Sequence, residues 1–216
     1  MIHDFNIPKG YVMGLVGKNG AGKSTLIRSI LEIIPRNTGD INILGLNFKD
    51  NAMEIKNRIG YVNDTFVFPP DANARKIGKQ IGQFYDHFDE TLYIQLLQKH
   101  DIDLHQSFKH FSKGMCAKYS IIFAIAHHAD FLILDEPTAN LDPVARREVL
   151  DLLYDLMQEE DKTILFLGDS ITEGHGVSER SKRFTDLIAA QSGANCVNYG
   201  ISGTRIAHQH AFDPAQ

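Results

Sequence analysis

Short apolar runs alternate with longer segments of helical periodicity along most of the chain. Continuous apolar runs over 10–17, 131–135 and 163–168 predict buried strands, because the strands of a parallel sheet are covered on both faces. Two shorter runs edged by glycine, at 39–45 and 58–64, predict further strands. Between the runs, apolar residues recur every three or four positions, the spacing of one helix face. This alternation predicts an α/β fold with an open, mostly parallel sheet and flanking helices.

Four segments combine helical spacing with end signals. They are residues 23–34, 89–100, 112–128 and 142–160. In the last segment, Asp142 suits the N-cap and Pro143 the first helical position. Either Asp89 or Thr91 is a plausible cap of the second segment. Because the sequence between the central strands is mixed and mostly helical, we expect a helical insertion over about 70–130.

The pattern repeats once more after the strand at 163–168. Residues 179–192 have helical spacing and are followed by Gly193, a typical residue just past a helix end. A short apolar run follows at 195–198. These two segments could extend the sheet by one right-handed βαβ unit.

Composition and charge narrow the function classes. The 216 residues carry a formal net charge of −5 and no basic stripe, which argues against a nucleic-acid partner. The two cysteines, Cys116 and Cys196, lie far apart, so we expect reduced thiols in a cytoplasmic protein. Residues 1–10 lack a signal-peptide profile, and the longest apolar run, 119–126, is too short to span a bilayer. We therefore expect a chain that does not itself cross a membrane.

The strongest chemical signal is the segment GKNGAGKST, which fits the P-loop pattern between a strand and a helix. Glycines let backbone N–H groups surround phosphate oxygens, and the helix N-terminus adds partial positive charge. Lys23 supplies a charge to the β- and γ-phosphates, and Ser24 offers a hydroxyl to Mg²⁺. The predicted nucleotide-binding residues are Gly17, Lys18, Asn19, Gly20, Ala21, Gly22, Lys23, Ser24 and Thr25.

A pair of carboxylates follows the buried strand at 131–135. Asp135 stands at the strand's C-terminal end, where it can hold Mg²⁺ together with Ser24. Glu136 is the next residue and can polarise an attacking water. We therefore predict Asp135 as a metal ligand and Glu136 as a catalytic residue.

Three motifs together resemble the ATP-binding cassette (ABC) ATPases, the motor subunits of ABC transporters. The motifs are GLVGKNGAGKSTL, FSKGM and LILDEPTANLDP, and the resemblance covers about residues 1–166. It implies a P-loop NTPase-like domain that binds ATP and Mg²⁺. It also implies a signature loop of Ser112, Lys113 and Gly114, in which Ser112 and Gly114 contact the γ-phosphate of a partner subunit's ATP, and a D-loop that carries Asp142.

The same resemblance implies partners. The signature loop requires a homodimer or a paired cassette subunit, and the motor requires a transmembrane permease subunit. The chain would then be cytoplasmic and peripheral at the inner face of the cell membrane.

Three positions depart from the cassette pattern. Asp64 stands where the family has its Q-loop glutamine, so it either orients water or magnesium as a catalytic residue or is a solvated strand end. The adenine-stacking aromatic residue has no clear counterpart, which predicts weaker and less base-selective nucleotide binding.

Asp169 stands where the family has a switch histidine that contacts the γ-phosphate, and His175 lies six residues on as a possible substitute. We therefore expect slow turnover.

A second resemblance begins where the first ends. The segments ILFLGDSITEGHG and RFTDLIAAQSGANCVNYGISGTRIA resemble the opening of the SGNH (GDSL) esterases and lipases. The resemblance covers about 163–210 and implies a C-terminal fragment, 163–216, of SGNH-hydrolase type. Ser170 matches the nucleophile and Gly203 an oxyanion-hole glycine. The Asp-x-x-His block that supplies the base in that family does not occur in the sequence, so both residues are expected to be vestigial.

Three functions therefore stay open. The first is an ABC-type ATPase subunit that is impaired in turnover. The second is a non-catalytic chimeric or fusion protein, joined near 163–168, that binds nucleotide only. The third is a serine ester hydrolase that uses Ser170. The pair His208 and His210 suggests either solvated side chains or metal ligands.

Overall fold

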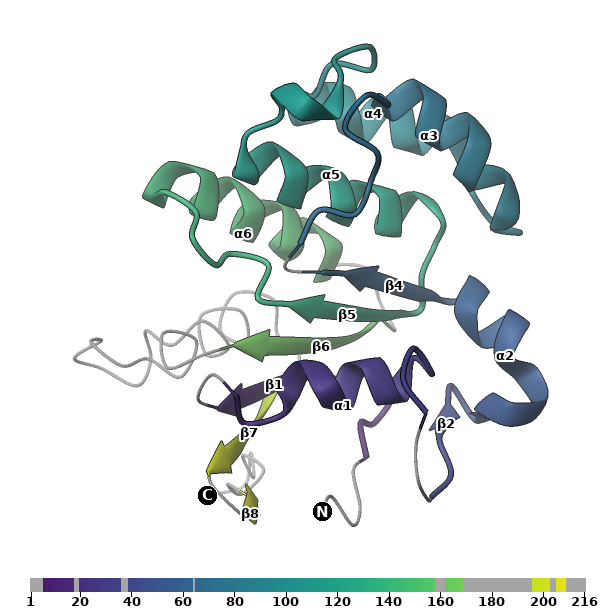
Figure 1. The fold of residues 1–216 in the computed structure, drawn as a ribbon, viewed down its shortest axis with the longest axis vertical. Helices are drawn as coiled ribbons and strands as arrows, with labels where there is room; N and C mark the ends of the chain where they lie inside the picture. Colours follow the sequence, from purple (N-terminus) through teal and green to yellow (C-terminus); the bar gives the residue numbers. More distant parts are fainter. Residues whose placement is uncertain are drawn as a thin grey trace. The chain divides into compact units, whose positions relative to one another are not determined.

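The computed structural model describes residues 6–17, 20–35, 39–63, 65–157, 162–168, 196–202 and 205–208. For β7, β8 and a few residues at the ends of other elements, only the backbone is described. The chain divides into two compact units. Unit 1 comprises 1–39 and 160–216, and unit 2 comprises 40–159. Figure 1 colours both along the sequence.

The strands of unit 1 run side by side with β1 between two parallel neighbours. β1 (Val12–Gly17) pairs with β6 (Thr163–Gly168) on one side and with β7 (Cys196–Ser202) on the other. β8 (Arg205–His208) then pairs antiparallel with β7. The strand predicted at 195–198 is longer than expected, and its neighbour in the sheet is β1. The antiparallel β8 was not predicted. The predicted helix at 179–192 lies outside the described residues.

The apolar runs of unit 1 are buried, as a parallel sheet requires. Each side chain from Ile164 to Leu167 is at most 1% exposed, and Met13 and Leu15 are 0% exposed. Two hydrogen bonds join the starts of β1 and β6. The Gly10 N–H donates to Oγ1 of Thr163 at 3.0 Å, and the Ile164 N–H donates to the Tyr11 carbonyl at 2.9 Å. α1 (Lys23–Ile30) follows β1 and is shorter than the predicted 23–34. It ends because Glu32 adopts a left-handed φ of 53°.

Unit 2 contains a second parallel pair, β4 (Ile59–Val62) with β5 (Phe131–Asp135). The predicted strand at 58–64 is shorter than expected. The one predicted at 39–45 is reduced to β2 (Asn42–Ile43), which forms a hairpin with β3 (Leu46–Asn47). α2 (Phe48–Asn57) follows the hairpin and was not predicted. The start of α2 is marked by a local signal in the sequence, the N-cap Asn47, whose side chain accepts the Lys49 N–H.

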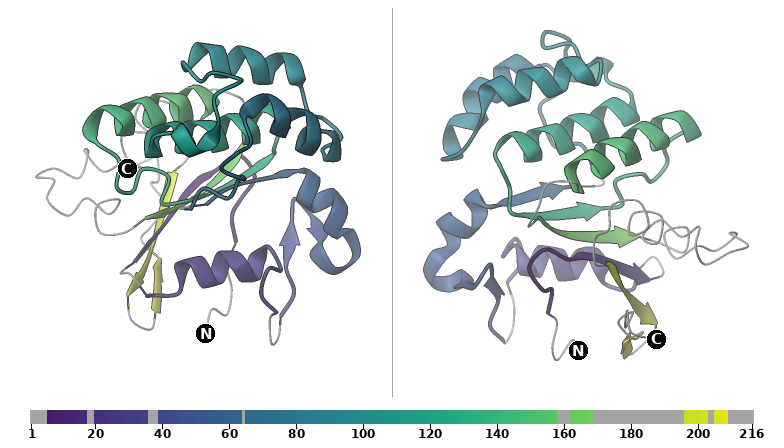
Figure 2. Two further views of the ribbon diagram at one scale, coloured as in Figure 1. Left: turned by 45° about the horizontal axis from the view of Figure 1, so that its top comes forward. Right: turned by 180° about the vertical axis from the view of Figure 1, so that it is seen from behind.

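Helices α5 and α6 lie side by side over β4 and β5 in both views (Figure 1, Figure 2). α5 (Lys113–Ala126) is capped by Ser112, and α6 (Pro143–Met157) follows Asp142. α5 ends two residues before the predicted 128, and residues 158–160 of the predicted segment 142–160 lie outside the described residues. α5 can approach the strands closely because β4 carries Gly60, where a Cβ would lie 2.8 Å from Cβ of Ala124.

The predicted helical insertion of unit 2 is present between β4 and β5. It contains α3 (Ala74–Ile81), η1 (Gly82–Phe84), α4 (Glu90–Lys99), η2 (Phe108–His110) and α5. Asp89 caps α4 by accepting the Leu92 N–H at 2.9 Å, which decides between the two caps left open. Aromatic rings form the core of this layer, with Phe66, Phe68, Tyr93, Phe108, Tyr119 and Phe123 in mutual contact. No helix within the described residues is long and apolar enough to cross a membrane.

Candidate functional site

The P-loop of unit 1 connects the end of β1 to the start of α1. Gly17 is the last residue of β1, and Lys18 and Asn19 lie outside the described residues. Gly20 and Gly22 adopt left-handed φ angles of 84° and 93°, which L side chains rarely adopt. A Cβ at either glycine would meet nothing within 4 Å, so the backbone conformation rather than packing requires glycine there. The loop therefore has the bent, open backbone that a phosphate group needs.

Helix α1 begins at Lys23, which is 5% exposed. Gly22 is its N-cap and has no side chain with which to cap the first N–H groups, and Ser24 and Thr25 complete the first turn. Because the first N–H groups of a helix lack partners within the helix, this end is rich in hydrogen-bond donors and carries partial positive charge. The described part of the loop therefore fits a bound phosphate chain.

The strand β6 ends beside the start of the P-loop. Gly168, its last residue, is the register partner of Val16, which stands one position before Gly17. The next residue in the sequence is Asp169, where the cassette resemblance predicts a switch histidine. Asp169 and His175 lie outside the described residues.

The acidic pair lies in unit 2, at the end of β5. Asp135 is the last residue of the strand and is 3% exposed. Glu136, which follows it, has a left-handed φ of 50°. A non-glycine residue in that region stores strain, and such residues concentrate at functional sites. The Ala139 N–H donates to the Glu136 carbonyl at 2.9 Å, so a tight turn begins at this residue. Sequence reasoning found the pair but not the left-handed backbone.

The predicted signature loop, residues 112–114, forms the start of α5. Oγ of Ser112 accepts the Met115 N–H at 3.1 Å. The hydroxyl hydrogen of Ser112 is not used in that bond, so it stays a donor. Lys113 is exposed in the first helical turn, and Gly114 is buried.

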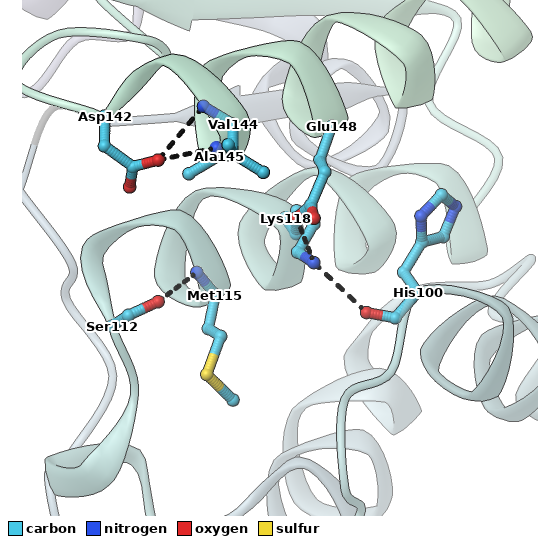
Figure 3. Close-up of polar contacts among 8 residues, drawn as sticks. All are labelled: His100, Ser112, Met115, Lys118, Asp142, Val144, Ala145 and Glu148. Atoms are coloured by element: carbon cyan, nitrogen blue, oxygen red, sulfur yellow. Dashed lines mark hydrogen bonds and ion pairs between the residues drawn. The ribbon is translucent and has the colours of Figure 1, made fainter.

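The D-loop, residues 140–142, precedes α6. Oδ1 of Asp142 accepts the N–H groups of Val144 at 3.0 Å and Ala145 at 3.1 Å, which confirms the predicted N-cap (Figure 3). Asn140 has a left-handed φ of 57°, which brings the chain sharply from the β5 turn to the helix.

A buried lysine near the signature loop was missed from the sequence. The side chain of Lys118 is 11% exposed, and its Nζ lies 2.8 Å from Oε2 of Glu148 in α6 and 3.2 Å from the His100 carbonyl (Figure 3). The sequence held a signal for this contact, because Lys118 lies inside the apolar stretch 115–126. A lysine buried with such a stretch needs a charged or polar partner.

The remaining predicted residues cannot be placed. Asp64, Ser170 and Gly203 lie outside the described residues, as does His210, and the side chain of His208 is not described. Among the residues that the structure describes, no group of three or more histidine, cysteine or acidic side chains could hold a metal ion. Burial raises the pKa of the Cys116 thiol, so this cysteine stays protonated and is a poor nucleophile.

Comparison with known proteins gives consistent matches. The family model described as ABC transporter matches residues 2–139. The chain is 36% identical over 178 residues to the bacitracin transport ATP-binding protein BcrA of Bacillus licheniformis, covering 79% of this chain and 56% of that protein. It is 30% identical over 211 residues to the energy-coupling factor transporter ATP-binding protein EcfA2 of Staphylococcus aureus, covering 89% of this chain and 70% of that protein.

A solved structure supports the fold. It is the dimeric, post-hydrolysis state of an ATP-binding cassette bound to ADP and Pi. The match has a TM-score of 0.69 at 18% identity and covers 96% of this chain and 89% of that one. The predicted P-loop NTPase-like α/β fold is therefore confirmed.

Proposed function

The chain belongs to the ABC transporter family, and on this premise we propose that it is the ATP-binding subunit of an ABC-type transporter. The match covers only 56% of the length of BcrA, so the activity of the whole protein is part of the proposal. The observation that carries it is the P-loop backbone, in which two left-handed glycines precede a helix that starts at the buried Lys23.

In this proposal the P-loop N–H groups and Lys23 bind the phosphates of ATP. Ser24 and Asp135 are the residues that would hold Mg²⁺, and a bound Mg²⁺ would supply positive charge that offsets the charge of the phosphates. Glu136 accepts a hydrogen bond from the attacking water and polarises it. Both interpretations of Asp64 stay open: it either orients water or is a solvated strand end.

The signature loop and the D-loop act on a second subunit. Ser112 can donate its hydroxyl hydrogen to a phosphate of the partner's nucleotide, because its oxygen alone is used in the cap of α5. Lys113 adds an exposed positive charge beside it. We propose a homodimer or a paired cassette, and a transmembrane permease that holds the chain at the inner face of the cell membrane. No nucleic-acid partner is proposed.

Binding is tested by thermal unfolding with and without Mg-ATP. At a ligand concentration of 100 times Kd, binding adds about 2.7 kcal/mol, or roughly 5–10 °C in Tm for a chain of this size. Lys23→Ala should lose this rise because the phosphates lose their lysine. Lys76→Ala, an exposed lysine of α3, is the matched control and should keep it. An equal rise in Lys23→Ala and wild type would overturn the P-loop assignment.

We further propose that turnover is impaired at position 169. β6 ends beside the P-loop, and the family resemblance expects a histidine after Gly168 that contacts the γ-phosphate. Loss of one such transition-state contact costs about 10²–10³ in rate. Asp169→His should raise turnover and leave the Kd for ATP nearly unchanged. A wild-type rate of about 1 s⁻¹ or more would contradict the proposal.

Separate experiments test the two alternative functions, a chimeric protein that only binds nucleotide and a serine ester hydrolase. A chimeric protein that binds nucleotide without hydrolysis would show the same residual rate in wild type and in Glu136→Gln. The esterase interpretation rests on the sequence resemblance alone, because the family model and the relatives and solved structure reported above are all of ATP-binding cassette type. We propose that Ser170 is inactive. Turnover of p-nitrophenyl acetate that disappears in Ser170→Ala would reverse this proposal.

A further inference from the structure

At Gly114 of the signature loop, α5 lies close to α6. A Cβ at this position would lie 2.7 Å from Cβ of Ala145 and 3.8 Å from Cα of the same residue. The same Cβ would lie 3.8 Å from Oγ of Ser112. Real Cβ atoms essentially never come as close as 2.7 Å to another carbon, so any side chain at Gly114 would push the two helices apart. The missing side chain is thus required by packing.

Ala145 belongs both to this contact and to the cap of its own helix. Its methyl group faces Gly114, and its backbone N–H donates to Oδ1 of Asp142 at 3.1 Å. On the other helix, Gly114 lies between Ser112 and Met115, the two partners of the α5 cap. Figure 3 shows the two caps at the starts of the neighbouring helices. A shift of Ala145 would therefore disturb both helix starts.

A second contact holds the same helix faces one turn further on. Lys118 stands four residues after Gly114, and Glu148 stands three residues after Ala145, so each pair shares a helix face. Nζ of Lys118 lies 2.8 Å from Oε2 of Glu148, and it also donates to the His100 carbonyl at the end of α4. Because α5 and α6 touch at two places along one interface, neither helix can rotate about a single contact without breaking the other.

We propose that Gly114 and Ala145 are positioning residues that join the signature loop to the D-loop, so that the two loops move as one body. The Lys118–Glu148 ion pair keeps the interface aligned. The consequence for catalysis rests on the proposed function: both loops would meet a partner subunit's nucleotide as one preformed surface. Gly114 would then be needed for the position of Asp142 as well as for its own approach to phosphate.

The test compares wild type with Gly114→Ala, Ala145→Gly and the double variant. In the double variant the methyl group moves from one helix to the other, so the contact regains its space. Hydrogen exchange of the full chain without nucleotide reports on the two segments 112–116 and 142–146. Gly114→Ala should speed exchange in both segments by about tenfold, the effect of moderate overpacking. The double variant should return within about threefold of wild type. Ala145→Gly cannot overpack, and it should loosen both segments even if Gly114→Ala does not fold.

The turnover of ATP supplies the second readout. Gly114→Ala should lower kcat at an unchanged KM. The double variant should recover only the part of kcat that depends on the position of Asp142, because the methyl group at position 114 still hinders the approach to phosphate. Glu148→Gln should also lower kcat, whereas Asp155→Asn, which breaks the exposed Lys99–Asp155 ion pair at the far end of α6, should not.

Two results would overturn the proposal. One is faster exchange in only one of the two segments in Gly114→Ala. The other is a double variant that exchanges as fast as Gly114→Ala. If wild type neither binds nor hydrolyses ATP, the proposed function fails, and the exchange measurements still decide whether the loops are joined.

Discussion

Glu136 combines a predicted catalytic role with a strained backbone, and three substitutions separate the two. Its φ of 50° lies in the left-handed region, where an L residue is about 1–2 kcal/mol less favourable than glycine. Glu136→Ala and Glu136→Gly both remove the carboxylate and every contact that it makes. They differ in the backbone preference, so the glycine variant should be more stable by about 1–2 kcal/mol.

The stability difference is measurable by urea unfolding or by calorimetry. For a chain of 150–250 residues, 1 kcal/mol corresponds to about 2–4 °C in Tm. Glu136→Gln keeps the length of the side chain, and it should unfold near wild type while its turnover falls by about 10²–10⁴, the usual loss for a general base. Single-turnover measurements at saturating Mg-ATP detect this loss even if the wild-type rate is low.

Each outcome tests one part of the reasoning. Equal stability of the alanine and glycine variants would show that the left-handed backbone carries no strain. Full turnover in Glu136→Gln would show that the carboxylate does not polarise the water. The nucleotide-dependent rise in Tm should persist in all three variants, because the P-loop is unchanged.

The remaining predictions concern the core of unit 2. The OH group of Tyr93 lies 2.8 Å from the Ala74 carbonyl and 2.9 Å from the Tyr119 OH; its single hydrogen serves the carbonyl, so Tyr119 donates to Tyr93. Tyr93→Phe removes two buried hydrogen bonds and leaves the Tyr119 hydroxyl without this acceptor, so it should cost about 2–3 kcal/mol, against about 1 kcal/mol for Tyr119→Phe; equal costs by urea unfolding would reject this assignment. Burial raises the pKa of Tyr119 above its ordinary 10.0, so the unfolded chain releases this proton first. Stability should therefore fall above about pH 10, by up to 1.4 kcal/mol per pH unit for each such tyrosine, and less steeply in Tyr119→Phe. Gly60→Ala should cost about 1–3 kcal/mol, because its Cβ would lie 2.7 Å from Cδ2 of Leu132; a neutral effect on unfolding would contradict the packing.

Local signals accounted for most of the predicted elements. The strands at 131–135 and 163–168 were placed correctly because parallel strands buried on both faces are apolar throughout. The cap Asp142 was also recognised, since a cap depends on residues within one turn. In contrast, α2 was missed, because it is short and its apolar positions are few. The bounds of α3 were not predicted, although it lies inside the expected helical insertion.

The sequence by itself predicted the phosphate-binding chemistry and determined the class of fold. A P-loop is a continuous segment, so its glycines, Lys23 and Ser24 are recognised without knowledge of any distant residue. The pairing of β7 with β1 was decided only by the tertiary structure, because an apolar strand carries no information about its neighbour. The contact of Gly114 with Ala145 likewise joins residues 31 positions apart, and only the packing of α5 on α6 brings them together. Periodicity records which face of an element is buried, whereas the partner of that face is chosen by the shape and volume of the whole core.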